Sequence, residues 1–218
     1  MEDTTIKDVL KTVQTLHDQK DYQAALKTLE ANKAEISPGL WHYNVGTIYG
    51  KLENWPLARY HLLMADTEGF RSKELFNNIL LVESKIESIK LEKPESTMDY
   101  FVMGGITASQ GVLTSISLIL VICGIFGLRK KINLKSSMVF FFMAIMVLGL
   151  NWWILSWNKN IVITPQPIKD GPSNIFESRG EVQPGLLIVG SQKGEWLKIY
   201  YPSRFQGWIK KSGLEELK

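Results

Sequence analysis

Two uncharged apolar stretches constrain this chain more than any other feature. The first covers residues 111–128, and its uncharged region reaches back to Phe101, while the second covers residues 137–157. Each is about as long as a helix that crosses a hydrocarbon core of roughly 30 Å. We therefore expect two transmembrane helices, at about 104–128 and 137–157, within a membrane region 102–157. A buried hairpin of a soluble core is disfavoured, because soluble helices are rarely apolar on every face.

The connector between these stretches, RKKINLK, is basic. It carries Arg129, Lys130, Lys131 and Lys135 and no acidic residue. Basic residues in short loops stay cytoplasmic, so we expect the loop 129–136 in the cytoplasm and both flanking regions on the far side of the membrane. The start, MEDTTIKDVL, has neither the basic nor the apolar part of a signal peptide. The opposite orientation, with both flanking regions cytoplasmic, therefore stays open.

The segment LWHYNVGTIYGKLENWPLARYHLLMA, residues 40–65, predicts two helices packed against each other. Small residues at Gly46, Ala58 and Ala65 would allow the helix axes to approach closely. The polar stretch KLEN is the expected turn, and Pro56 falls at the start of the second helix, where its missing N–H costs nothing.

This hairpin pattern repeats approximately. DYQAAL at residues 21–26 matches NWPLAR at residues 54–59 with a spacing of 33, and Asn78 and Ile79 follow Asn44 and Val45 at a spacing of 34. The period resembles that of the tetratricopeptide repeat (TPR), which implies a curved array that binds partner segments. We expect TPR-like helices over 1–92, with no second helix in the third unit, and a linker at 93–101. A plain helical bundle is the alternative.

The C-terminal region 160–218 predicts a small all-β barrel. Short β-branched and aromatic runs alternate with Gly and Pro turns. One strand is expected within 161–176, and in WLKIYY the residues Leu197, Ile199 and Tyr201 alternate with Trp196, Lys198 and Tyr200, so one face should be buried.

The order of turns in this region resembles the bacterial SH3-like domain. The resemblance rests on DGPS at residues 170–173, Gly185, Trp196 and the closing GWI at residues 207–209. Ile168-Lys169 replaces the usual Val-Arg, and YPSRF lengthens one hairpin, so ligand residues of that family transfer poorly. The expected fold class is therefore a multidomain membrane protein, with α-helical TPR-like repeats, a two-helix transmembrane hairpin and a small all-β SH3-like barrel.

The sequence contains no pattern typical of an enzyme. His17, His42 and His61 have no metal-ligand spacing, and no nucleophile elbow or phosphate-binding loop occurs. The lone Cys123 lies in an apolar run, where we expect no reactivity. We predict no catalytic activity, cofactor, metal or nucleic-acid partner.

Six residues are candidates for binding a partner. They are Tyr43, Asn44, Thr47 and Asn78 on the helical repeats and Trp196 and Tyr200 on the barrel. Hydrogen bonding between repeats is an alternative role for the two asparagines, and packing is an alternative role for the aromatic residues. For Trp208, packing is the favoured role.

The whole arrangement resembles the TPR/SH3 membrane proteins of the Bat (aerotolerance) operons of bacteria, the BatE type. The resemblance implies a non-enzymatic scaffold in the bacterial inner membrane, with the TPR-like and SH3-like regions in the periplasm. Its implied partners are von Willebrand A-domain membrane proteins and a MoxR-type AAA+ ATPase, acting in envelope stress tolerance. The alternative is a cell-wall sensor whose SH3-like domain binds peptidoglycan.

Overall fold

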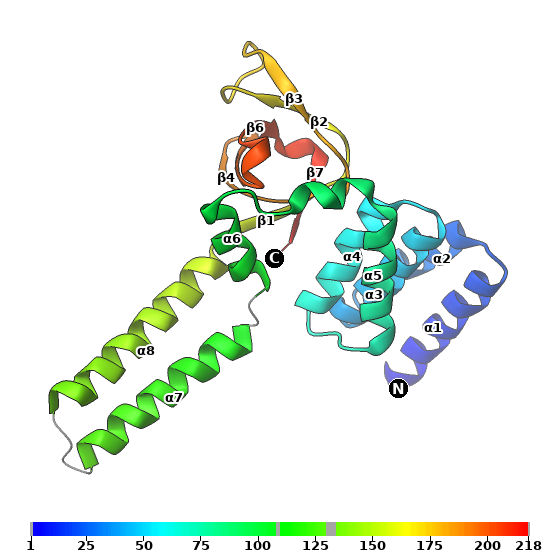
Figure 1. The fold of residues 1–218 in the computed structure, drawn as a ribbon. Coiled ribbons are helices and arrows are strands. Elements are labelled where there is room, and N and C mark those ends of the chain that lie inside the picture. Colours follow the sequence, from blue (N-terminus) through cyan, green and yellow to red (C-terminus); the bar gives the residue numbers. More distant parts are fainter. Residues whose placement is uncertain (1, 108–109, 130–133, 218) are drawn as a thin grey trace. The chain divides into compact units, whose positions relative to one another are not determined.

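The computed structural model describes residues 2–107, 110–129 and 134–217 (Figure 1). The chain forms two compact units. One combines Met1–Lys93 with Asn158–Lys218, and the other is Pro94–Trp157. The N-terminal helices and the C-terminal strands therefore belong to one unit, although the apolar stretches separate them in the sequence.

The N-terminal region consists of paired helices. The first pair is α1 (Glu2–Asp18) and α2 (Tyr22–Ala31), and the second is α3 (Pro38–Lys51) and α4 (Trp55–Thr67). Helix α5 (Lys73–Lys85) is followed by the short 3-10 helix η1 (Glu87–Glu92). The side chains of Asp21, Asn54 and Ser72 accept hydrogen bonds from backbone N–H groups three residues later, at the starts of α2, α4 and α5.

Gly46 lies where α3 and α4 approach closely. A Cβ atom there would lie 2.9 Å from Leu62 Cγ and 3.0 Å from the Leu62 backbone nitrogen. Ala58 and Ala65 of α4 are fully buried in the same region. The predicted hairpin, with its turn between Tyr49 and Trp55, is therefore confirmed.

The repeat spacing has a counterpart in the packing of α3 and α5. Trp41, Val45 and Ile48 of α3 are buried in a cluster with residues of α1 and α2. Their counterparts in α5, one repeat spacing of 34 further along the chain, pack in a cluster with residues of α4: Leu75, Ile79 and Val82. Each of the two helices thus uses the same face to contact the preceding pair.

The C-terminal region forms a seven-stranded antiparallel sheet in the order β3-β2-β6-β5-β4-β1-β7. The strands are β1 (Asn158–Val162), β2 (Gln166–Lys169), β3 (Ser178–Val182), β4 (Leu187–Lys193), β5 (Trp196–Tyr201), β6 (Gly207–Lys210) and β7 (Leu214–Leu217). Six of these strands contribute buried residues to one core, so the sheet curls around it. The region 161–176, predicted to hold one strand, contains the end of β1 and all of β2, since the chain turns at Thr164-Pro165.

A buried arginine joins the helices to the sheet. Arg59 of α4, only 5% exposed, donates through Nη1 to Glu92 Oε1 (2.5 Å) and to the Gly185 carbonyl (2.6 Å), and through Nη2 to Glu83 Oε1 (3.0 Å). Glu92 Oε1 also accepts from the backbone N–H of Leu187 (2.6 Å). Burial opposes the charge of Arg59, but its hydrogen bond to Glu92 and the charges of Glu92 and Glu83 outweigh burial and raise its pKa. We call this set of contacts the Arg59 junction.

The second unit contains α6 (Thr97–Thr107), α7 (Gln110–Arg129) and α8 (Leu134–Leu155). Two segments, Gly111–Arg129 and Lys135–Leu155, are long and apolar enough to cross a membrane. The boundaries differ from those predicted, because part of the predicted linker and the start of the first predicted span form α6. The start of α6 could have been recognised in the sequence from Ser96 and Asp99, which have the spacing of a helix cap. Ser96 Oγ accepts from the Asp99 N–H, and Asp99 Oδ2 accepts from the Ser96 N–H.

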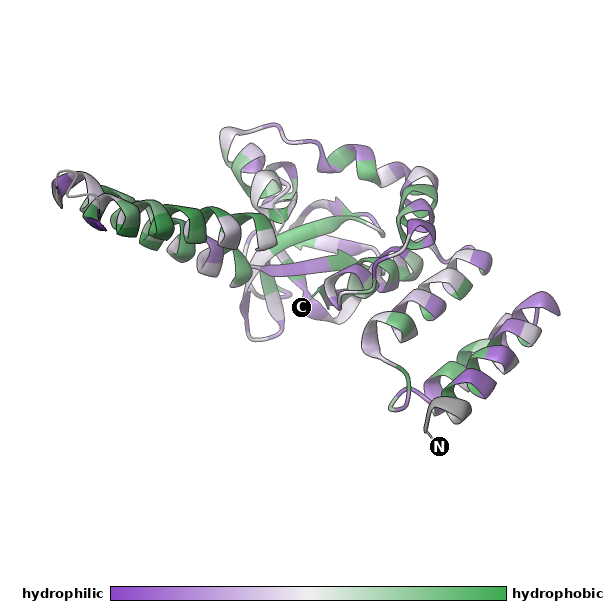
Figure 2. Ribbon diagram, turned by 90° about the horizontal axis from the view of Figure 1, so that it is seen from below, coloured by the Kyte–Doolittle hydropathy of each residue, from purple (hydrophilic) through white to green (hydrophobic). Residues whose placement is uncertain are grey.

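Helices α7 and α8 pack on each other through small residues. A Cβ on Gly124 would lie 3.0 Å from the Phe141 ring, and Ser117 Oγ donates to the Ala144 carbonyl over 3.2 Å. Figure 2 shows that α7 and α8 are hydrophobic over most of their length. Only 17% and 11% of the two apolar segments is buried, so most of their apolar surface faces outward. Contact with lipid would satisfy such surfaces, whereas a hairpin in a soluble core would be covered on most sides.

Candidate functional site

Strands β5 and β6 present aromatic and basic side chains on the outer face of the sheet. Leu197, Ile199 and Ile209 point into the core, so their neighbours point outward. The strand register places Trp196 opposite Lys210 and Lys198 opposite Trp208. We call this surface the aromatic–lysine face; its members are Trp196, Lys198, Tyr200, Trp208 and Lys210.

The lysines of this face lie near the aromatic rings. Lys198 Nζ is 5.8 Å from the ring centre of Tyr200 and 6.0 Å from that of Trp208, and Lys210 Nζ is 5.7 Å from that of Trp196. These distances are at the outer limit of cation–π attraction. The rings therefore attract the lysine ammonium groups only weakly, and the lysines keep their positive charge.

Tyr200 is held at the edge of the face. It is 42% exposed, and its hydroxyl lies 2.8 Å from Ser191 Oγ on β4. Trp196 and Trp208 are each half-buried. The two predicted aromatic candidates thus lie together on one solvent-facing surface, and Trp208, for which the sequence favoured packing, lies beside them.

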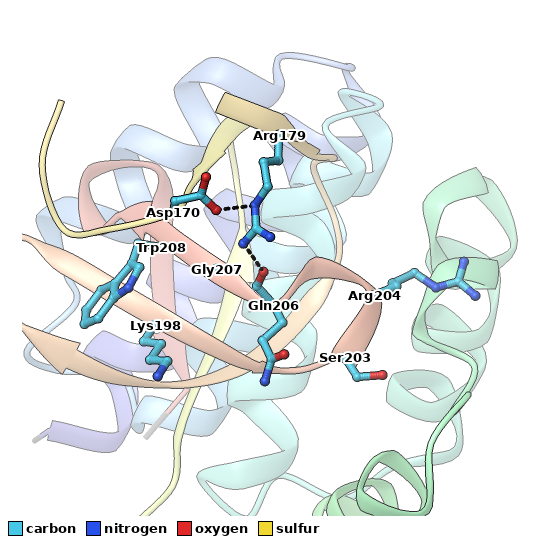
Figure 3. A pocket seen from close by; sticks show the side chains of 8 residues that line it. All are labelled: Asp170, Arg179, Lys198, Ser203, Arg204, Gln206, Gly207 and Trp208. Carbon is cyan, nitrogen blue, oxygen red and sulfur yellow. Dashed lines mark hydrogen bonds and ion pairs between the residues drawn. The ribbon is translucent and has the colours of Figure 1, made fainter. Parts of the chain in front are cut away.

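An open pocket of about 520 Å³ adjoins this face (Figure 3). Its lining includes Lys198 and Trp208 and six further residues: Asp170, Arg179, Ser203, Arg204, Gln206 and Gly207. Arg179 Nε contacts Asp170 Oδ1 at 2.5 Å, and Arg179 Nη2 donates to the Gln206 carbonyl over 3.4 Å. The Asp170 carboxylate in the pocket lining is therefore paired with Arg179.

The pocket and the aromatic–lysine face are basic. The pocket lining contains three cationic side chains and one carboxylate, and Lys210 adds a further positive charge. Within the part of the chain that the structure describes, no carboxylate pairs with Lys198. Such a surface favours an acidic ligand that can also lie against aromatic rings.

The four candidate binding residues on the helices make their contacts within the helical region. Asn78 Nδ2 donates to Thr47 Oγ1 (3.2 Å), which links α5 to α3. Asn44 Nδ2 donates to the carbonyl of Leu40 (2.8 Å), and the Tyr43 ring stacks on Phe70 with the centroids 4.7 Å apart. For Asn78 the structure thus has the hydrogen bond between repeats that the sequence left open as an alternative.

Two histidines meet between α3 and α4. The Nδ1 atoms of His42 and His61 are 2.9 Å apart, among the rings of Trp41, Tyr49 and Tyr60. Burial, the neighbouring His42 and Lys33 lower the pKa of His61 to about 3. Burial and Lys33 lower the pKa of His42 as well, against Glu68. Both rings are therefore neutral near pH 7, and the Nδ1–H of one ring donates a hydrogen bond to the Nδ1 of the other.

Nothing in the described residues gathers the ligands of a metal ion. No group of three or more His, Cys, Asp or Glu side chains there could hold one. Cys123 is exposed on α7. Of the predicted topology residues, Arg129 and Lys135 lie exposed at the ends of α7 and α8, while Lys130 and Lys131 fall outside the described residues.

Sequence reasoning missed the basic half of the site. The alternation in WLKIYY already placed Lys198 on the same side as Trp196 and Tyr200, so this signal was available. Arg179 is distant in sequence and comes to the pocket only because β3 pairs with β2 and β2 pairs with β6.

Comparison with known proteins adds no relative: no protein-family model, no curated protein and no solved structure matches the chain.

Proposed function

We propose that this protein is a non-enzymatic scaffold, anchored in a membrane by α7 and α8, that binds partner proteins through its helical repeats and its sheet. The observation that carries the proposal is the aromatic–lysine face, which stands on a sheet fixed to the helices by the Arg59 junction. A rigid support of this kind holds a partner in a defined orientation.

The finer assignments belong to the same proposal. The common packing face of α3 and α5, at a spacing close to the tetratricopeptide period, supports TPR-like repeats. The short strands that curl around one core support an SH3-like barrel. With the two apolar helices, they support the likeness to BatE-type proteins of the bacterial inner membrane. The proposed partners are then von Willebrand A-domain membrane proteins and a MoxR-type ATPase system.

A cell-wall sensor is the second candidate, and the pocket favours it. Peptidoglycan peptides carry carboxylates, which Lys198 could attract beside the Trp208 ring. Both candidates use the same surface, so an experiment has to compare the two ligands directly.

The test uses the full chain, solubilised in mild detergent or placed in lipid nanodiscs. Co-purified membrane proteins are quantified by mass spectrometry for the wild type, the variant K198Q/K210Q and the control K11Q/K27Q, which removes two exposed lysines of α1 and α2. We expect recovery of partners to fall severalfold for K198Q/K210Q alone. Muropeptides should give no saturable binding at millimolar concentration. If muropeptides bind at micromolar concentration and Trp196→Ala abolishes this binding, the sensor function is favoured over the scaffold function.

A further inference from the structure

The outer side of α5 is apolar and uncovered. Phe76 is 61% exposed, Leu80 50% and Leu81 55%, and they lie on neighbouring turns of one helix. Isolated exposed apolar residues are ordinary, but a contiguous group on one face indicates an interaction surface. We call these three residues the α5 face.

The repeat register identifies what belongs on this face. Counting back by the same repeat spacing, Phe76 corresponds to His42, Leu80 to Gly46 and Leu81 to Thr47. In the second pair, His42 contacts His61, and Gly46 lies against Leu62, both on α4. Phe76 and Leu80 therefore occupy the positions that in α3 face the second helix of the pair.

Within the compact unit that contains α5, the described residues supply no second helix that follows α5 and pairs with it in this way. Directly after α5 comes η1, which binds the sheet instead, since Ser88 Oγ donates to the Pro184 carbonyl (2.9 Å) and Glu92 belongs to the Arg59 junction. The third pair is thus left with one helix.

The two ends of the helical stack differ in polarity. At the first end, α1 exposes polar side chains: Lys7, Asp8, Lys11, Thr12, Gln14 and Thr15. A polar outer face is what keeps the end of a repeat array soluble. The α5 face has the opposite character, and the polar end of another copy offers it no matching surface.

We propose that the α5 face binds an amphipathic helix of a partner protein, which takes the place of the missing second helix of the third pair. Sizes specify this helix further. In the second pair a glycine on α3 meets Leu62 on α4, whereas α5 presents Leu80 at the glycine position. The partner helix should therefore carry a small residue opposite Leu80, with apolar residues one turn away for Phe76.

This inference rests on the proposed scaffold function for the source of the helix, and its surface is separate from the aromatic–lysine face. The two can fail independently. Loss of binding at α5 would leave the effect of K198Q/K210Q on partner recovery unchanged, and the reverse also holds.

The experiment uses the full chain in nanodiscs and two fluorescent stapled peptides with the sequence of residues 54–68, which includes α4. One peptide keeps Leu62 and the other carries Leu62→Ala. Fluorescence anisotropy measures binding to the wild type, L80A, F76D and the control I175A, whose exposed isoleucine lies on the sheet part. Hydrogen exchange of residues 73–85 reports where the peptide binds.

We expect the Leu62→Ala peptide to bind the wild type at least fivefold more tightly than the Leu62 peptide, and L80A to remove or reverse that preference. F76D should abolish binding, I175A should not change it, and bound peptide should slow exchange in α5. Absence of saturable binding, or binding that F76D leaves intact, would overturn the proposal. Dimerisation of the wild type that F76D abolishes would overturn it in favour of a second copy.

Discussion

At the scale of single residues, Gly46 determines how closely α3 and α4 can approach. Its counterpart for comparison is Gly50 in the same helix, where an added Cβ would find only Val82 Cγ2, at 3.9 Å. The two glycines therefore separate the effect of crowding from the effect of helix propensity, because alanine favours a helix over glycine at both positions.

We expect Gly46→Ala to lower the free energy of unfolding by about 1–3 kcal/mol, since the new methyl group must displace the backbone of α4. Gly50→Ala should leave stability unchanged or raise it by up to about 1 kcal/mol. Thermal unfolding of the full chain in detergent measures both. Equal effects of the two substitutions would contradict close packing at Gly46.

The buried histidine pair makes stability depend on pH. The pKa of His61 is about 3 in the folded chain and 6.5 as its ordinary value, so the unfolded chain binds a proton first as the pH falls. The contribution of the neutral ring is complete above pH 6.5 and is lost progressively from there toward pH 3. Protonation of both rings would leave both Nδ1 atoms as donors, which removes their hydrogen bond.

We expect the full chain to be roughly 2 kcal/mol less stable at pH 5 than at pH 7 through His61. His61→Phe keeps an aromatic ring against Tyr49 and removes the titrating group, so its stability should change less over this range. Chemical unfolding in detergent at several pH values provides the measurement. If the wild type and His61→Phe show the same pH dependence of stability, groups other than His61 cause it.

At the scale of elements, α7 and α8 form a hairpin with positive residues at its turn. Arg129 is the last residue of α7, and Lys135 lies in the first turn of α8. Positive residues at these ends favour a cytoplasmic turn if the two helices cross the membrane. The proposed orientation then places the helical repeats and the sheet on the periplasmic side.

Cysteine labelling tests this orientation in intact cells that express the full chain with Cys123→Ser. A cysteine at Ser136 should resist an impermeant maleimide, whereas cysteines at Glu95 and Ser173 should react. All three should react once the membrane is opened. The reversed pattern would place both flanking regions in the cytoplasm and would rule out a scaffold function in the periplasm.

At the scale of the whole molecule, the Arg59 junction makes the helices and the sheet one unit. Removing one partner of a buried ion pair leaves the other charges unpaired and typically costs about 3–5 kcal/mol. The exposed pair of Arg71 and Asp66 is a matched comparison, because exposed pairs contribute about 0–1 kcal/mol.

We expect Arg59→Met to speed hydrogen exchange in η1 and at the start of β4, with Arg71→Met close to the wild type. The free energy of opening at these segments should fall by about 3 kcal/mol or more. If exchange in η1 and β4 were unchanged, the two parts would be stable independently of this contact.

Local patterns already determined much of this architecture. The apolar stretches predicted two long helices, and the small residues predicted the hairpin of α3 and α4. The alternation in WLKIYY predicted the buried and exposed sides of β5. These features follow from side-chain period and length, which neighbouring residues specify on their own. The aromatic candidates Trp196 and Tyr200 were found on this basis.

Tertiary structure alone decided how distant residues meet. Arg59 lies 126 residues from Gly185, and Arg179 reaches the pocket through strand pairing, so no local period could reveal either contact. The Asn78–Thr47 bond and the His42–His61 pair likewise depend on how helices pack. Binding surfaces arise from such juxtapositions, because burial and charge partners are properties of the folded chain and not of any one segment.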